Sequence, residues 1–239
     1  MHDEDLEVGL ELSYFSCLPQ EVEAMKRRTF VMSTMLAPVA LAGYGTEAAT
    51  AKRPTAGEGS ASQPADESCD FRVITLGTGA PPPEIERFGP SALVEVAGQY
   101  LLFDVGRGAL QRLTQLGIPA SDINRVFITH LHSDHTVGLP DLYLTGMLSG
   151  PFGGRKEPFR ITGVEGTKEM MDYMKLAYSA DSKIRIKDGE LQPEWTEIET
   201  MEFTEDGVVY EKAGVKVTAF ENFHGEAIKP SFGCRIDYD

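Results

Sequence analysis

A six-residue segment near the middle of the chain has the side chains of a metal-binding site. It reads His-Leu-His-Ser-Asp-His, and its four candidate ligands are His130, His132, Asp134 and His135. The chain has five histidines, and a further one, His224, follows far along the sequence. Neutral imidazole and carboxylate are ligands that zinc and its chemical neighbours accept. The cluster therefore predicts a metal site; the alternative is a set of loop histidines that bind no metal.

The residues on either side of this segment predict where the ligands lie. The apolar run 126–128 predicts a buried strand, and the Gly-Leu-Pro sequence at 138–140 predicts a loop or the start of a helix. The ligands would then lie at the carboxyl end of a strand, where α/β folds place their chemistry. In an extended segment His130, His132 and Asp134 would share one side, while His135 would point elsewhere unless the chain turns. This alternation predicts a motif divided between two adjacent metals.

The chain after residue 70 alternates between strand and helix patterns. Strands are expected at 71–76, 91–96, 99–103, 159–162, 208–210, 215–220 and 231–236, and helices at 109–116, 139–148 and 167–178. The Ala-Gly pair at 97–98 predicts a hairpin, and Gly117 would end the first helix. Paired strands interspersed with helices predict an α/β fold, a sandwich with mixed sheets.

The composition narrows the classes of protein. The 239 residues fit one domain with a leader, and the formal net charge of −15 argues against nucleic acid as the main partner. The three cysteines are few and widely spaced, which excludes a disulfide framework or a Cys-x-x-Cys site. The sequence has no Gly-x-Ser-x-Gly motif, so no serine nucleophile is expected.

The first 51 residues predict an export signal preceded by a short extension. A basic segment at 25–30 contains an arginine pair, an apolar run follows at 31–42, and an Ala-x-Ala pattern occupies 49–51. This order is that of a signal peptide, and the arginine pair resembles a twin-arginine signal. The apolar run is shorter than the ~20 residues that span a bilayer, so no stable membrane span is expected. The protein would be periplasmic or secreted, or cytoplasmic if the leader is not a signal.

Three regions therefore divide the chain. Residues 1–51 are expected to be the upstream extension and signal peptide. Residues 52–69, rich in Ala, Gly, Ser, Pro and Glu, predict a disordered linker. Residues 70–239 would form the folded domain.

The metal motif with its flanks, Thr129 to His135 followed by the Gly-Leu-Pro sequence, resembles that of the metallo-β-lactamase-fold hydrolases. Within them it is most similar to the ribonuclease Z-like and arylsulfatase-like branch. Three further segments carry the resemblance, at 76–79, at 102–106 and at 223–233. It covers about residues 71–239 and implies an αββα sandwich of mixed sheets flanked by helices.

The resemblance also implies roles for individual residues. His130, His132 and His224 would hold one zinc ion, and Asp134 and His135 would contribute to a second. Asp104 would hydrogen-bond and orient the motif loop. The implied activity is zinc-dependent hydrolysis of phosphate or sulfate esters by metal-bound hydroxide, with Asp134 as the catalytic residue that orients or deprotonates the water. The alternatives are a lactone, thioester or β-lactam hydrolase of the same fold, or a non-catalytic truncated fragment that binds metal.

The sequence departs from the family pattern after the third motif. Family members continue to an aspartate in a Gly-Asp-Thr context and to a later histidine, and this sequence ends at Asp239 without them. We therefore expect a truncated domain with an incomplete second half, which holds one zinc more readily than two. The substrate is expected to be a small-molecule ester and not nucleic acid, and a homodimer is left open.

Overall fold

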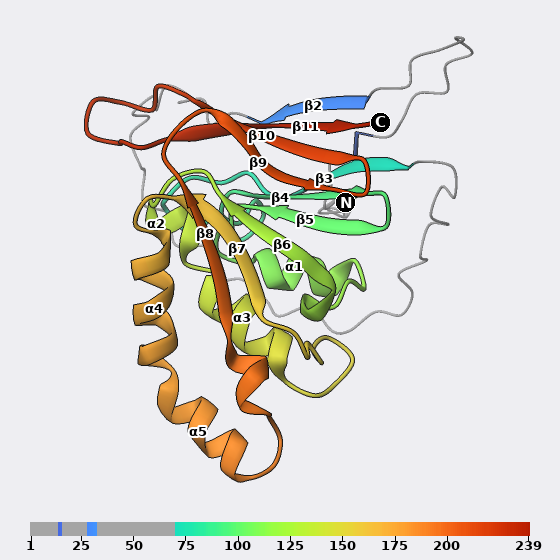
Figure 1. Cartoon of the computed structure of the whole chain (residues 1–239), viewed down its shortest axis with the longest axis vertical. Helices are drawn as coiled ribbons and strands as arrows, with labels where there is room; N and C mark the ends of the chain where they lie inside the picture. Colours follow the sequence, from blue (N-terminus) through green and yellow to red (C-terminus); the bar gives the residue numbers. More distant parts are fainter. Residues whose placement is uncertain (1–13, 16–27, 33–69) are drawn as a thin grey trace, which may run out of the picture.

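The computed structural model describes residues 14–15, 28–32 and 70–239, which form two packed sheets with helices on one side (Figure 1). The larger sheet has seven strands in the order β1-β3-β4-β5-β6-β7-β8, and the smaller has four in the order β2-β11-β10-β9. The larger sheet consists of β1 (Tyr14–Phe15), β3 (Phe71–Gly77), β4 (Ser91–Val96), β5 (Gln99–Phe103), β6 (Ile123–Ile128), β7 (Phe159–Val164) and β8 (Ile198–Phe203).

The larger sheet is mixed, and its parallel half positions the site. Strands β3, β4 and β5 are antiparallel neighbours, and Ala97 and Gly98, both with positive φ, make the tight turn between β4 and β5. From β5 to β8 each strand is parallel to the next. The residues that follow β5 and β6 therefore leave the sheet at the same edge, and these are Asp104 and the metal motif.

The smaller sheet is antiparallel throughout. It consists of β2 (Arg28–Met32), β9 (Gly207–Lys212), β10 (Val215–Glu221) and β11 (Phe232–Tyr238). Strands β10 and β11 pair over seven residues each, from Val215 opposite Tyr238 to Glu221 opposite Phe232. The loop that joins them, 222–231, therefore projects from one end of the sheet.

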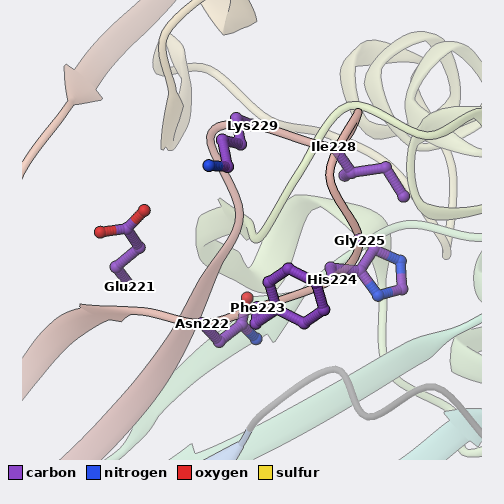
Figure 2. Close-up of a pocket in the computed structure, with 7 residues that line it drawn as sticks. All are labelled: Glu221, Asn222, Phe223, His224, Gly225, Ile228 and Lys229. Atoms are coloured by element: carbon purple, nitrogen blue, oxygen red, sulfur yellow. The ribbon is translucent and has the colours of Figure 1, made fainter.

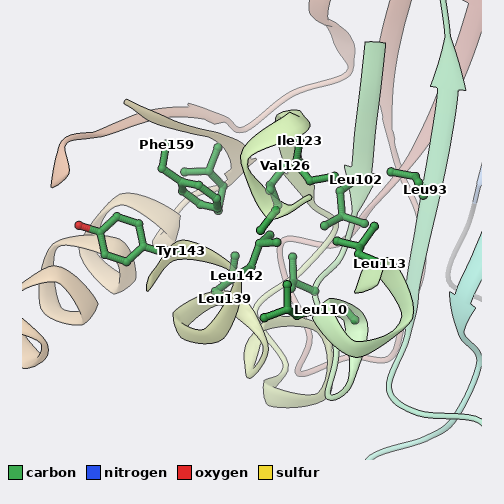
Figure 3. Packing of buried hydrophobic residues seen from close by; sticks show 14 of the residues in the cluster. Leu93, Leu102, Leu110, Leu113, Ile123, Val126, Leu139, Leu142, Tyr143 and Phe159 are labelled. Carbon is green, nitrogen blue, oxygen red and sulfur yellow. The ribbon is translucent and has the colours of Figure 1, made fainter. Parts of the chain in front are cut away.

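The helices are α1 (Ala109–Gln115), α2 (Ser133–Thr136), α3 (Leu139–Met147), α4 (Thr167–Ala177) and α5 (Ser179–Lys187), with short 3₁₀ turns at Ala120–Asp122 and Pro193–Thr196. Helices α1, α3 and α4 pack on the face of the larger sheet that is turned away from the smaller one, α2 lies in the metal motif after β6, and α5 follows α4 without a buried residue. Figure 3 shows the core under α1 and α3, where Leu113 and Leu142 pack toward Leu102 and Val126 of the sheet. All four side chains are fully buried.

A second core fills the space between the two sheets. Phe103 and Phe127 stack there with ring centroids 4.8 Å apart, against Val217 and Ile236 of the smaller sheet. The described residues thus build a helical layer and two sheet layers, which confirms the predicted α/β fold with mixed sheets. A second helical layer is not present among the described residues.

The strands and helices predicted from the sequence are found where the side chains are regularly buried. Elements without regular burial were not predicted. All the strands and helices expected after residue 70 are present, with ends that agree within three residues. Strand β8 was not expected because none of its residues is fully buried, so it has no continuous apolar run. Helix α5 was not expected because none of its residues is buried, and it therefore has no apolar stripe.

Only part of the predicted leader is described. Arg28–Met32, inside the expected signal peptide, forms β2 and pairs with β11, and Phe30 packs against the core between the sheets. The remainder of the expected signal peptide, including 33–51, and the expected linker 52–69 lie outside the described residues, so both stay predictions. Of the helices described, none has the length and apolar character that crossing a bilayer requires.

Candidate metal centre

The metal motif leaves β6 and turns into a short helix. His132 still has an extended backbone, with φ −62° and ψ 145°, and α2 begins at the next residue. The alternation expected of an extended segment therefore stops at His132. The helical turn buries Asp134 and His135, each 7% exposed. It also places the ring centroid of His135 4.1 Å from that of His130.

The third histidine comes from the other sheet. His224 lies in the β10–β11 loop, with its ring centroid 4.6 Å from that of His130 and 5.7 Å from that of His132. The loop is held to the motif by a hydrogen bond from the Phe232 amide to the carbonyl of Thr129, at 3.0 Å. One candidate ligand atom from each of His130, His132 and His224 lies within 4.8 Å of the others.

A chain of hydrogen bonds orients two of the imidazole rings. Asp104 Oδ2 accepts from Thr129 Oγ1 at 2.8 Å and from His135 Nδ1 at 2.7 Å. Thr129 Oγ1 also lies 3.0 Å from His130 Nδ1. Since the single hydroxyl proton of Thr129 goes to Asp104, Oγ1 accepts from His130 Nδ1. His130 and His135 therefore both carry the proton on Nδ1 and present the lone pair of Nε2 to the site.

Asp104 is itself held in place by its backbone. Its φ is +56°, a left-handed conformation that aspartate tolerates better than most residues, and its amide donates to the Phe127 carbonyl at 2.8 Å. Its other carboxylate oxygen, Oδ1, accepts from the Thr129 amide at 2.9 Å. Two residues on, a Cβ added to Gly106 would lie 2.7 Å from the carbonyl oxygen of Asp134. The Asp-x-Gly segment thus combines a fixed carboxylate with a glycine that lets the motif backbone approach.

The electrostatic environment keeps the candidate ligands available. Burial, with the like charges of the neighbouring histidines, lowers the pKa of His130 to about 4. Burial also lowers the pKa of His224. For His135, burial is outweighed by the hydrogen bond to Asp104 and by the charges of Asp104 and Asp134, so its pKa is raised. His130 and His224 are therefore neutral near pH 7, which is the state that binds a metal.

The three histidines fit a metal ion. His130 Nε2 lies 3.2 Å from His132 Nδ1, close to the ~3.3 Å between two nitrogens bound at tetrahedral zinc. His224 Nδ1 is buried without a hydrogen-bond partner. An unpaired buried nitrogen is costly unless something fills its lone pair or takes its proton. Asp134 and His135 lie beside this group, with Asp134 Oδ2 at 3.7 Å from His135 Nε2.

A cavity opens next to the third histidine. Its volume is about 230 Å³, and its wall is formed by the end of β10 and by the β10–β11 loop. Figure 2 shows the lining residues Glu221, Asn222, Phe223, His224, Gly225, Ile228 and Lys229. The sequence analysis placed Ile228 and Lys229 within the segment 223–233 that resembles the family, but it assigned neither residue a role. Both residues lie within five positions of His224, and this closeness was a hint that they contribute to the site. The sequence does not show how the loop folds to bring them to one cavity. Thr129 was likewise seen only as part of the motif, and its hydroxyl is a central link of the hydrogen-bond chain.

Comparisons with known proteins agree with this geometry. The family described as anti-Pycsar protein Apyc1 matches residues 71–239. Ribonuclease Z of Mycobacterium marinum is 36% identical over 169 residues, which cover 71% of this chain and 60% of the relative. The chain thus spans about 60% of the length of this curated relative.

Two solved structures share the fold. Human tRNase Z, short form, has a TM-score of 0.53 and 24% identity, and the match covers 69% of this chain and 64% of that one. The metallo-β-lactamase-fold protein YhfI of Bacillus subtilis has a TM-score of 0.51 and 17% identity, covering 70% and 58%. Together with the two-sheet architecture, the histidine cluster and the family match, these likenesses lead to one conclusion: the chain belongs to the anti-Pycsar protein Apyc1 family, in the ribonuclease Z-like branch of the metallo-β-lactamase-fold proteins.

Proposed function

We propose that this chain carries the metal site of a zinc-dependent hydrolase that acts on small phosphate or sulfate esters. The observation that carries the proposal is the convergence of His130, His132 and His224 within 4.8 Å. Asp134 adds a buried carboxylate beside them. Three histidines with room for a further ligand form a donor set typical of catalytic zinc.

Different residues have different roles in the proposed hydrolysis. A zinc ion, when bound, supplies a Lewis acid that lowers the pKa of water and polarises the ester. Asp134 orients the attacking water and accepts its proton at the carboxylate. Asp104 holds His135 directly and His130 through Thr129, so the imidazole lone pairs stay aimed at the site.

We propose that one zinc binds to the three histidines more tightly than any second ion. Among the described residues, Asp134 and His135 lie beside the three histidines as candidate ligands of a second ion, and Asp134 Oδ2 lies 3.7 Å from His135 Nε2. Two protein ligands hold zinc less well than three, because each adds a bond and a share of the geometry. Metal analysis of the purified chain by mass spectrometry counts the ions directly.

The proposed substrate is a small anionic ester. The chain carries a formal net charge of −15, which opposes binding of a long polyanion. The lysine in the cavity wall, Lys229, favours an anionic ester over a neutral lactone. The relatives named ribonuclease Z bear a name that refers to RNA, so an RNA substrate belongs in the test.

A substrate panel tests this function. The zinc-loaded full chain would be assayed with bis(4-nitrophenyl) phosphate, 4-nitrophenyl sulfate, a γ-lactone and a structured RNA. Hydrolysis of the phosphodiester or the sulfate that disappears in His130→Ala supports the proposal. Turnover of the lactone or the RNA alone would replace it with that activity, and no turnover at all would favour a metal-binding fragment without catalysis.

Two further expectations remain proposals. Export rests on the sequence of residues 25–51, and cell fractionation with an antibody to the chain tests it. A homodimer through α4 and α5 is supported by exposed apolar side chains there: Tyr173 is 63% exposed, Leu176 67% and Ile184 60%. Light scattering on a size-exclusion column would show whether Leu176→Glu converts a dimer into a monomer.

A further inference from the structure

The loop that joins β3 to β4, residues 78–90, packs against the base of the metal motif. A Cβ added to Gly89 would lie 3.0 Å from Cα of Gly106 and 3.1 Å from the carbonyl oxygen of Asp134. From the other side, a Cβ added to Gly106 would lie 2.4 Å from the carbonyl carbon of Gly89. Glycine at both positions lets three backbone segments lie in direct contact. A movement of the loop would therefore reach the backbone of Asp134.

Backbone hydrogen bonds tie this loop to the Asp-x-Gly segment and to the residue that follows it. The Gly89 amide donates to the Arg107 carbonyl at 2.9 Å, and the Gly106 amide donates to the Pro90 carbonyl at 3.0 Å. These two bonds run in opposite directions between the same two stretches of backbone. The end of the loop and the Asp-x-Gly segment are therefore held as one unit.

The Asp-x-Gly segment is tied to the metal motif as well. The Val105 amide donates to the His135 carbonyl at 2.7 Å, and the Gly138 amide donates to the Val105 carbonyl at 2.9 Å. The Ser91 hydroxyl, at the start of β4, donates to the Asp104 carbonyl at 2.8 Å. The segment thus has hydrogen bonds to the loop and to the motif, and it couples the positions of the two.

The loop itself has little burial to hold it in this position. Residues 80–87 are all exposed, and Phe88 is the first half-buried residue after them. Phe88 has φ +57°, a left-handed conformation that is unfavourable for a bulky residue. Its ring lies against the start of α1, where a Cβ on Gly108 would come within 2.4 Å of the ring Cγ. Such a backbone conformation persists only where the surroundings hold it.

Arg112 of α1 holds both Phe88 and the exposed part of the loop. Its guanidinium carbon lies 4.7 Å from the centroid of the Phe88 ring. Nη2 donates to the Glu86 carbonyl at 2.8 Å, and Nη1 donates to Gln115 Oε1 at 2.9 Å. Arg112 is only 5% exposed, so its charge is largely shielded from water, and this strengthens its attraction to the ring. One side chain thus binds the loop at two neighbouring points.

We propose that Arg112 and Phe88 are positioning residues of the metal centre. The pair fixes the loop, the loop holds the Asp-x-Gly segment, and both set where Asp134 lies relative to the three histidines. Their role rests on the proposed function, in which Asp134 orients the attacking water. Because these contacts run through the backbone, releasing the pair should loosen the loop, the Asp-x-Gly segment and the motif together, and leave the core strands unchanged.

Hydrogen exchange of the zinc-loaded full chain, followed by mass spectrometry, measures this loosening in peptides that cover 84–90, 104–108 and 133–138. Arg112→Met keeps the apolar stem and removes the charge and the donors. It should speed exchange in these three segments by about 10-fold, while β7 and β10 exchange as in the unmodified protein. Arg185→Met removes the same group from α5, where the side chain is 32% exposed, and should leave all three segments unchanged.

Phe88→Gly separates the contact with Arg112 from the backbone conformation. Glycine adopts a positive φ without strain, so on backbone grounds alone the loop should exchange more slowly. We expect the opposite, faster exchange at 84–90 and 133–138, because the ring on which Arg112 packs is lost. Phe88→Tyr keeps the face of the ring and should exchange as the unmodified protein does.

Three results would overturn the positioning role: unchanged exchange in Arg112→Met, an equal acceleration in β7 and β10, or slower exchange in Phe88→Gly. The second of these would indicate a general loss of stability. Equal zinc content in every variant shows that the three histidines still bind the metal. The substrate panel tests the proposed function separately, and selective loosening in a chain that hydrolyses no ester would retain the role of the pair and reject the function.

Discussion

The carboxylate of Asp104 lies 2.7 Å from Nδ1 of His135, across 31 residues of sequence. The same carboxylate holds Thr129, and through it His130. One buried aspartate at the end of β5 therefore sets the orientation of two histidines in a motif that follows β6. The parallel pairing of β5 and β6 makes this possible, because both segments leave the sheet at one edge.

Asp104→Asn should weaken zinc binding by about 10-fold to 100-fold, the usual cost of losing a residue that orients a metal ligand. The amide keeps the size of the side chain, but it can accept at only one atom and carries no charge to hold His135. Competition with a chromogenic chelator measures the affinity. Asp141→Asn, which alters an exposed aspartate hydrogen-bonded to Gln111, is the matched control and should keep the affinity of the unmodified protein.

His132→Ala should lower the zinc content of the purified chain to well below one ion per molecule. His132 is an exposed member of the three-histidine group, so its removal takes away a ligand with little effect on packing. Elemental analysis after dialysis gives the ratio. His2→Ala removes the one histidine that is outside the proposed ligand set and should leave the zinc content unchanged. Equal zinc in His132→Ala and the unmodified chain would refute the site.

Lowering the pH should destabilise the metal-free protein through His130. Its pKa is about 4 in the fold, against an ordinary value of 6.5 for a solvated imidazole. Above pH 6.5 the imidazole is neutral in both the folded and unfolded chain. Below that value only the unfolded chain takes up the proton, so the free energy of unfolding falls until about pH 4, by on the order of 3 kcal/mol.

Urea denaturation of chelator-treated protein between about pH 7 and about pH 4 measures this effect. His130→Asn lacks the titrating group and should show a shallower loss of stability over the same range. Parallel curves for the two proteins would show that His130 does not contribute to the pH dependence.

Leu113→Ala should reduce the free energy of unfolding by about 2–5 kcal/mol, the range for a fully buried leucine whose removal leaves a cavity. Leu113 is 0% exposed under α1, at the centre of the core between the helices and the larger sheet. Leu176→Ala removes the same atoms from a side chain that is 67% exposed on α4 and should cost much less. Thermal and urea melts of the two variants compare them directly; similar losses would contradict the assignment of the core.

Much of the fold could be predicted from the sequence because local patterns report burial. The apolar run before His130 is the buried end of β6, and the pair Ala97-Gly98 has the positive φ angles of a tight hairpin turn. Strand β8 and helix α5 were not predicted by these patterns. Their side chains are mostly exposed or half-buried, so sequence periodicity carries little information there.

The sequence by itself determined the kind of chemistry, since the ligand types and their close spacing predict a zinc site without any coordinates. Only the tertiary structure decided how the ligands combine. The turn into α2 at Ser133 ends the alternation expected of an extended strand and moves His135 next to His130. His224 reaches the same point from the other sheet, and Phe223 and Lys229 come with it to one cavity. Residue spacing predicts which side chains are neighbours within one helix or strand. The contacts between His224 and the metal motif depend instead on how the two sheets pack through a shared core, which is a property of the whole chain.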